Sequence, residues 1–214
     1  MFPLNLFPLP GETIALHIFE ERYQVLFEQL ETMEVDEFGI PFVDGTDRKT
    51  LGGVMRLVFA SEPDENGFRD AAVQCVGLFQ LESFEASGKK LNAPYPLGQI
   101  RKWSEWKNWI VSNEADSYFS KTVALSTSTE TNPTADGLIP AMIKHQVPAK
   151  KRFDILSAPN EKKRNEHIEK AARFAFLIAE QEAQRNNGYF PNWDPIFVAW
   201  RMPTQWAYLL PCPS

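Results

Sequence analysis

The chain has 214 residues, of which 43% are hydrophobic and 23% charged, a composition typical of a soluble globular protein with a sizeable core. Its net charge of −6 argues against a general nucleic-acid binder, because such proteins usually carry a basic surface. No stretch approaches the ~18 apolar residues needed to cross a bilayer, and the N-terminus lacks the features of a signal peptide. The two cysteines, Cys75 and Cys212, match no metal-ligand spacing, so we expect a reduced, cytoplasmic setting.

The first hundred residues are predicted to form mostly β-strands with one inserted helix. Apolar, β-rich runs cover residues 38–43, 53–60 and 70–81, and Asp44-Gly45 closes the first of them as a turn. Gly77, inside the third run, predicts a bulge or a close approach of backbones. The helix is indicated by apolar residues at helical spacing, namely Phe19, Tyr23, Leu26, Phe27 and Leu30. Short strands around one helix favour a small barrel or a strongly bent sheet.

The segment after these strands is marked by three tryptophans, Trp103, Trp106 and Trp109, which recur every three residues. That period suits a helix or a 3₁₀ turn better than a strand. Residues 126–136 are rich in Ser and Thr and contain Asn132-Pro133, so they predict a loop or linker.

From residue 138 onward the pattern is helical. A helix is predicted over 161–186, capped by Ser157 or Asn160 and followed by the stop signal Asn187-Gly188. At about 1.5 Å per residue it would be close to 40 Å long. The last segment, 189–214, carries three tryptophans and five prolines, and we expect it to pack irregularly on the body of the protein.

Charge is unevenly distributed between these regions. Residues 1–100 carry 16 acidic and 7 basic side chains, whereas residues 144–173 carry 9 basic and 4 acidic ones. The contrast favours two units with different surfaces. The basic cluster comprises Lys150, Lys151, Arg152, Lys162, Lys163 and Arg164. It is interpreted as a solvated helix-terminal face, or as a surface that pairs with the acidic unit of the same molecule or of a neighbour.

The opening of the chain combines four short motifs whose spacing needs no gap. They are Phe2-Pro3-Leu4, Pro10-Gly11-Glu12, Leu16-His17-Ile18-Phe19-Glu20 and Arg22-Tyr23. This pattern resembles the start of the Lon protease N-terminal domain, the substrate-engaging part of that enzyme. Ala15 and Glu21 depart from it, because the family usually has prolines there. Weaker similarities follow at 38–40, 52–57, 66–67 and 76–81, so the resemblance covers residues 1–100 and extends loosely to about 187.

The resemblance implies an α+β fold with a PUA-like β-barrel subdomain over 1–125 and a helical subdomain over 137–188, followed by the tail at 189–214. It implies a binding module for a polypeptide client or a protease component. The motor and protease parts of Lon are not recognisable in this sequence. The only Gly-Lys pair, Gly88-Lys89, lacks the remaining Walker A residues, and no Ser–Lys protease segment is found. We therefore expect a protein that is not an enzyme and needs no cofactor or metal.

Six residues are the candidates for peptide binding: Phe19, Arg22, Tyr23, Trp103, Trp106 and Trp109. Tryptophan is enriched at binding hot spots, and an apolar groove between barrel and helices with a charged rim would hold a polypeptide. The competing interpretation is structural, with the tryptophans packed on the barrel and Glu20 paired with Arg22. An RNA-associated PUA-like module is the alternative function, since Arg101, Lys102 and Lys107 accompany the tryptophans. A small hydrolase ranks third, because no nucleophile and base can be paired.

Overall fold

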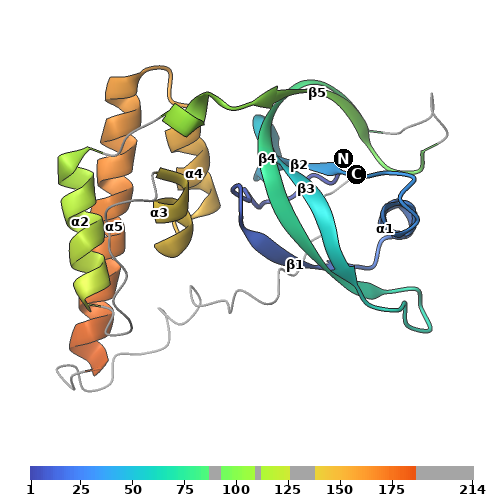
Figure 1. The fold of residues 1–214 in the computed structure, drawn as a ribbon, viewed down its shortest axis with the longest axis horizontal. Helices are drawn as coiled ribbons and strands as arrows, with labels where there is room; N and C mark the ends of the chain where they lie inside the picture. The colour runs from blue at the N-terminus through green and yellow to red at the C-terminus, as the bar shows by residue number, and fades with distance from the viewer. Residues whose placement is uncertain (87–92, 109–111, 126–137, 187–214) are drawn as a thin grey trace. The chain divides into compact units, whose positions relative to one another are not determined.

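The computed structural model describes residues 1–86, 93–108, 112–125 and 138–186. The chain divides into two compact units, and the division in sequence falls between Ser104 and Glu105. The first unit is built on an antiparallel sheet with one helix, and the second is helical (Figure 1). The α+β class and the long C-terminal helix expected from the sequence are thus confirmed.

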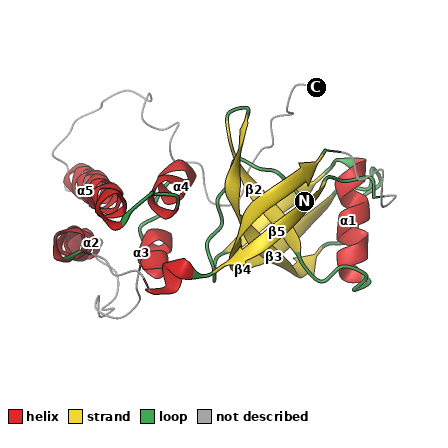
Figure 2. Ribbon diagram, turned by 90° about the horizontal axis from the view of Figure 1, so that it is seen from above, coloured by secondary structure: helices red, strands yellow, loops and turns green. Residues whose placement is uncertain are grey.

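The sheet of the first unit has five strands and is antiparallel throughout (Figure 2). Its elements are β1 (Thr13–Ile18), α1 (Glu21–Glu31), β2 (Phe38–Asp44), β3 (Asp47–Ala60), β4 (Arg69–Glu85) and β5 (Leu97–Trp103). The strands follow the order β1-β4-β3-β2, and β5 also pairs with β4. Strands β1 and β5 pair with different parts of β4: β1 pairs with its first half and β5 with its second half.

Bulges bend the long central strands. The β3–β4 register shifts between Val54 and Met55, directly beside Gly77, which confirms the bulge predicted there. A second shift lies between Leu57 and Phe59. The turn predicted at Asp44-Gly45 is also present, with Gly45 at a φ of 64° between β2 and β3.

The bent sheet is not closed into a barrel by the strands that the structure describes. The outer side of β2 is instead lined by the start of the chain, where the Phe2 amide donates to the Gly39 carbonyl at 2.8 Å and the Leu4 amide to that of Pro41. A parallel bridge joins Leu4 to Phe42. The expected barrel is therefore replaced by an open sheet, and a PUA-like arrangement stays a prediction.

Helix α1 covers the core of the sheet unit with the apolar stripe that its sequence predicted. Tyr23, Leu26, Phe27 and Leu30 are all buried, as the 3.6-residue period requires. The Phe27 ring packs edge-on against Phe38 of β2, with centroids 5.6 Å apart. Burial of such side chains contributes about 1.5–3 kcal/mol each, so this stripe fixes the helix on the sheet.

The second unit is helical in its described residues. It contains a 3₁₀ helix (Glu105–Asn108), α2 (Asn113–Leu125), α3 (Leu138–Lys144), α4 (Ala149–Leu156) and α5 (Glu161–Asn186). The predicted long helix is confirmed as α5, and Asn160 rather than Ser157 caps it, since the Asn160 Oδ1 accepts the Lys163 amide at 2.9 Å.

The sheet unit was expected to extend to residue 125, but the division between the two units falls after Ser104. Residues 105–125 belong to the helical unit because α2 packs along α5. The Ser112 hydroxyl donates to Glu169 at 3.1 Å, and the rings of Tyr118 and Phe176 lie 6.0 Å apart. The predicted linker at 126–136 and the tail at 189–214 fall outside the described residues, so both remain predictions.

Candidate functional site

The residues predicted at the start of α1 have different roles in the structure. Tyr23 is only 3% exposed and packs on Phe2 with ring centroids 4.0 Å apart, so it builds the core. Arg22 pairs with Glu20 at 2.6 Å and lies over the Tyr23 ring at 4.7 Å. This is the structural interpretation considered for that pair. Phe19, by contrast, is half-buried at the surface.

The predicted tryptophan group is not a single helical face. Trp103 ends β5, pairs with Leu78 and is 9% exposed, whereas Trp106 is half-buried in the 3₁₀ helix. Trp109 lies outside the described residues. The helical or 3₁₀ period therefore holds for Trp106 and not for Trp103.

Phe19 and Trp103 do not share a compact site. Ile18, next to Phe19, pairs with Arg69, whereas Trp103 pairs with Leu78. The two positions are thus separated by about nine residues of β4, or roughly 30 Å of strand. Phe19 and Trp103 therefore do not line one pocket around a single side chain of a client.

The structure instead places exposed apolar residues together on the outer face of β1, β4 and β3. Phe59 pairs with Ala72, and Ala72 pairs with Ala15, so the three side chains form one row on one face. Phe59 is 61% exposed. The next row on the same face begins with His17, which pairs with Asp70.

Three aromatic rings extend this surface. The His17 ring lies 6.2 Å from Phe19 and 6.1 Å from Phe68, and the two phenylalanine rings lie 6.5 Å apart. His17 Nδ1 is 2.8 Å from Asp70 Oδ1, which holds the imidazole in place. We call the set Ala15, His17, Phe19, Phe59, Phe68 and Ala72 the outer-face patch. Of these residues, only Phe19 was among the sequence candidates.

The missed residues carried a weak signal in the sequence. Val58 and Phe59 are adjacent and both exposed, which strand alternation forbids unless a bulge intervenes. Without the register, however, an outward Phe59 looks the same as an inward one. Val58-Phe59 before a turn was the only available hint.

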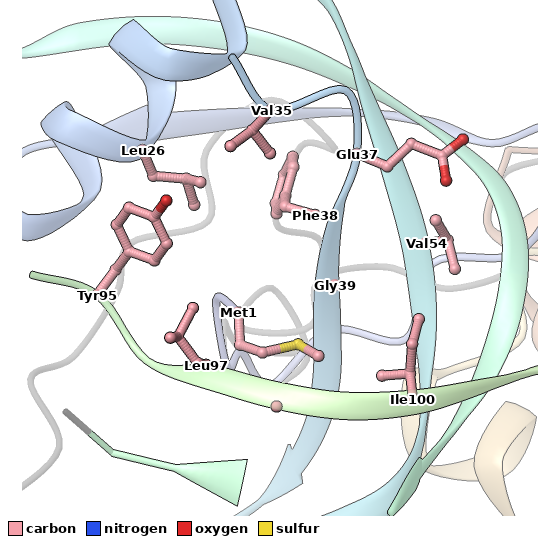
Figure 3. A pocket seen from close by; sticks show the side chains of 11 residues that line it. Met1, Leu26, Val35, Glu37, Phe38, Gly39, Val54, Tyr95, Leu97 and Ile100 are labelled. Carbon is pink, nitrogen blue, oxygen red and sulfur yellow. The ribbon is translucent and has the colours of Figure 1, made fainter. Parts of the chain in front are cut away.

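The sheet unit also contains an apolar pocket of about 350 Å³ (Figure 3). It is lined by Met1, Leu26, Val35, Glu37, Phe38, Gly39, Val54, Tyr95, Leu97, Gly98 and Ile100. Figure 3 shows the Glu37 carboxylate directed away from Leu26 and Tyr95. That carboxylate accepts from Arg56 at 2.9 Å and from Lys102 at 3.4 Å.

The polar groups of this pocket are already engaged. The Tyr95 hydroxyl donates to Gln29 Oε1 at 2.6 Å, and burial together with Glu34 raises the pKa of Tyr95. The Met1 α-amine donates to the Pro96 carbonyl at 2.7 Å, and burial lowers its pKa to about 6. Among these eleven lining residues no nucleophile stands beside a base.

The described part of the chain also contains the thiol of Cys75 and side chains of the types that bind metal ions. Cys75 is buried and free, and burial raises the pKa of its thiol to about 12, so it stays protonated at neutral pH. No cluster of three or more potential metal ligands is found among the described residues. No described helix is both long enough and apolar enough to span a membrane.

The basic cluster of the helical unit is not one solvated face. Arg152 is buried, and its Nε donates to the Val147 carbonyl at 2.6 Å. Lys163 pairs with Glu166 at 2.7 Å, one turn along α5. The charges of this region are thus partly used inside the unit, which leaves a weaker basic surface than the sequence indicated.

Comparison with known proteins identifies the fold. No protein-family model and no curated protein matches the sequence. Among solved structures, a Lon N-terminal domain protein from Xanthomonas campestris superimposes with a TM-score of 0.56 at 16% identity, covering 79% of this chain and 93% of that one. The N-terminal domain of a Mycobacterium avium complex Lon protease gives a TM-score of 0.44 at 10% identity, covering 85% and 96%. The chain therefore has the fold of the Lon N-terminal domain.

Proposed function

We propose that this chain is a non-catalytic protein-binding module that holds exposed apolar segments of other polypeptides, either unfolded segments or a protease-associated partner. The outer-face patch is the binding surface in this proposal. Its support is the exposure of Phe59 in line with Ala72 and Ala15, beside the rings of Phe19 and Phe68. The fold shared with Lon N-terminal domains points the same way.

The physical basis of binding is removal of this patch from water. Contiguous exposed apolar surface on a folded protein marks interaction sites, and aromatic side chains contribute most at such sites. Burial stabilises a complex by roughly 25 cal/mol per Å² of apolar area, before the cost of ordering the partner. Asp70, which pairs with His17 of the patch, supplies a polar border.

A polypeptide fits this surface better than RNA does. RNA binding needs cationic side chains next to aromatic rings, and the patch itself contains none that is permanently charged. The first hundred residues carry a net charge of −9, which repels phosphate. The proposal includes no cofactor. It keeps the cytoplasmic setting expected from the cysteines, with Cys75 free and buried.

Fluorescence anisotropy tests the proposal with labelled, reduced and carbamidomethylated α-lactalbumin, which is permanently unfolded. Native α-lactalbumin and a single-stranded RNA serve as parallel probes. We expect saturable binding to the unfolded probe alone, and weakening by about tenfold or more for Phe59→Ser. Phe174→Ser is the matched control, because Phe174 is a 55% exposed phenylalanine on α5 of the other unit.

Two results would overturn the proposal. Equal loss of affinity in Phe174→Ser and Phe59→Ser would mean that the outer-face patch is not the site. Binding to RNA with a strong salt dependence, and not to the unfolded probe, would place the RNA-associated function first.

A further inference from the structure

The described sheet has three outer strands, β2, β5 and β1, whose outer edges are protected to different degrees. The outer side of β2 is lined by residues 2–4, and β2 contains Pro41. The outer edge of β5 carries Arg101 and Lys102, and charged side chains discourage the addition of another strand. Strand β1 reads Thr-Ile-Ala-Leu-His-Ile, without proline or a permanent charge. Of these three outer strands, β1 is the one without such protection.

The hydrogen bonds fix which backbone groups of β1 face this open edge. The Asp70 backbone is used toward β3, since its carbonyl accepts from the Ser61 amide at 2.8 Å and its amide donates to the Ser61 hydroxyl at 3.0 Å. Ala71 therefore faces β1, where its partner is Leu16.

Alternation along β1 then settles the remaining positions. If Leu16 faces β4, the N–H and C=O groups of Thr13, Ala15 and His17 point away from it. Among the described residues, none forms a backbone hydrogen bond to these groups. All three residues are exposed. The open edge thus presents a regular row of donors and acceptors to solvent.

We infer that β1 takes an extended segment of the client as an added strand, which rests on the proposed function and specifies its mode. Backbone pairing with Thr13, Ala15 and His17 would align the segment. A bulky apolar side chain opposite Ala15 would lie over the small Ala15 side chain, at the border of the outer-face patch. The partner is therefore an extended polypeptide with apolar residues at alternate positions.

A second copy of this chain fits the edge less well than such a segment. Pairing of two β1 strands would join only six residues of each copy, whereas a stable interface between folded domains needs about 1,000 Å² or more. A flexible segment can pair with the edge and also cover the adjacent outer-face patch. Its backbone and alternate side chains then contribute together.

The first test uses the full chain with the Ala15→Pro substitution. Proline removes the outward amide of Ala15 and is tolerated on edge strands where that amide faces solvent, so pairing with β4 is kept. We expect an affinity for the unfolded probe at least about tenfold weaker than that of the wild type. Unchanged thermal unfolding of the variant is the folding control.

The second test needs no variant of the protein. A short labelled peptide with alternating apolar and polar residues is compared with two versions that are N-methylated at alternate amides of opposite parity. Strand addition predicts that one parity abolishes binding and the other is tolerated, because only every second amide faces the partner strand. Amide exchange should slow at Thr13, Ala15 and His17 on binding, and not at Leu16, which already faces β4.

The outcomes separate this inference from the proposed function. Wild-type affinity in Ala15→Pro, with equal effects of both N-methylation parities, would overturn strand addition, while a loss in Phe59→Ser would keep the patch as the site. A concentration-dependent dimer that Ala15→Pro abolishes would assign the edge to a second copy. Failure of the wild type to bind any unfolded probe would overturn both proposals.

Discussion

Met1 and Gly39 share one space, because a Cβ atom added to Gly39 would lie 2.6 Å from Sδ of Met1. A Cβ atom added to Gly98 would likewise lie close to Met1, 3.2 Å from its Cε. The thioether therefore fits between glycines of β2 and β5. The Met1 α-amine donates to Pro96 and the Phe2 amide to Gly39. The first two residues thus connect β2 to the start of β5, where a closed barrel would have paired strands.

The loss of unfolding free energy caused by glycine-to-alanine substitutions should depend on which atoms the added methyl group contacts. Gly39→Ala meets the flexible Met1 side chain and the Phe79 ring, so we expect a loss of about 1–2 kcal/mol in unfolding free energy. In Gly52→Ala the new carbon would lie 2.3 Å from the Ile40 carbonyl oxygen, which requires the backbone to move, and the loss should reach about 3 kcal/mol.

Gly77→Ala is the control for this series, because nothing lies within 4 Å of its added carbon. Its unfolding free energy should stay within about 0.5 kcal/mol of the wild type in urea titrations. A Gly77→Ala variant as unstable as Gly52→Ala would show that backbone freedom, not space, decides the effect.

The Met1 α-amine should make stability depend on pH. Burial lowers its pKa from 8.0 to about 6, so the unfolded chain binds more protons than the folded chain between these values. The α-amine therefore makes its full contribution to the unfolding free energy above about pH 8. As the pH falls toward 6 the unfolding free energy should decrease by about 2–3 kcal/mol in total. Urea titrations across this pH range measure the change in unfolding free energy, and the NMR shift of the Met1 ε-methyl group follows the titration of the amine.

His145 is the group to remove in the control, since burial and Lys144 lower its pKa and give a pH dependence of the same sign. The His145→Gln variant should keep the part of the pH dependence of the unfolding free energy that arises from the Met1 α-amine. A Met1 ε-methyl shift that titrates with a midpoint near 8 would contradict the prediction.

Local features of the fold were accessible from the sequence, because they depend on neighbours along the chain. The stripe of α1, the turn at Gly45 and the extent of α5 all follow from short-range periodicity and turn chemistry. Closure of the sheet could not be predicted in the same way. It depends on whether strands far apart in sequence pair, and here Met1 and Phe2 occupy the relevant gap.

The candidate site was predicted less well, for a related reason. Phe19 was named on its motif, but Phe59 and Ala72 join it only through the β1–β4–β3 register. Alternation gives two faces to every strand and does not say which is outward. Trp103 was misplaced because its three-residue spacing to Trp106 spans the end of a strand and the start of a 3₁₀ helix.

The cap of α5 provides a prediction for the helical unit. Asn160→Ala removes the acceptor of the Lys163 amide and should lower the unfolding free energy by about 1 kcal/mol. Asn160→Asp should keep the cap, because a carboxylate also accepts this amide and is favoured at a helix N-terminus. Ser157→Ala is the control, as its hydroxyl only donates to the Phe153 carbonyl at the end of α4. Thermal unfolding in which Ser157→Ala costs more than Asn160→Ala would reverse the assignment.

The ion pair between Arg69 and Glu31 should matter for both stability and binding. The Arg69 side chain is 7% exposed and pairs with Glu31 of α1, while its chain neighbour Phe68 belongs to the outer-face patch. Glu31→Gln leaves the buried guanidinium without its counter-charge. Because Glu31 itself is 39% exposed and screened by water, we expect a loss of about 1–2 kcal/mol rather than the larger cost of a fully buried pair.

The exposed pair between Arg22 and Glu20 is the control for this change. Glu20→Gln should alter the unfolding free energy by no more than about 0.5 kcal/mol. If the ion pair of Arg69 also holds Phe68 in place, Glu31→Gln should lower the affinity for the unfolded probe several-fold, whereas Glu20→Gln should leave that affinity unchanged. Equal affinity in both variants, at unequal stability, would show that the ion pair supports the fold and that Phe68 keeps its position without it.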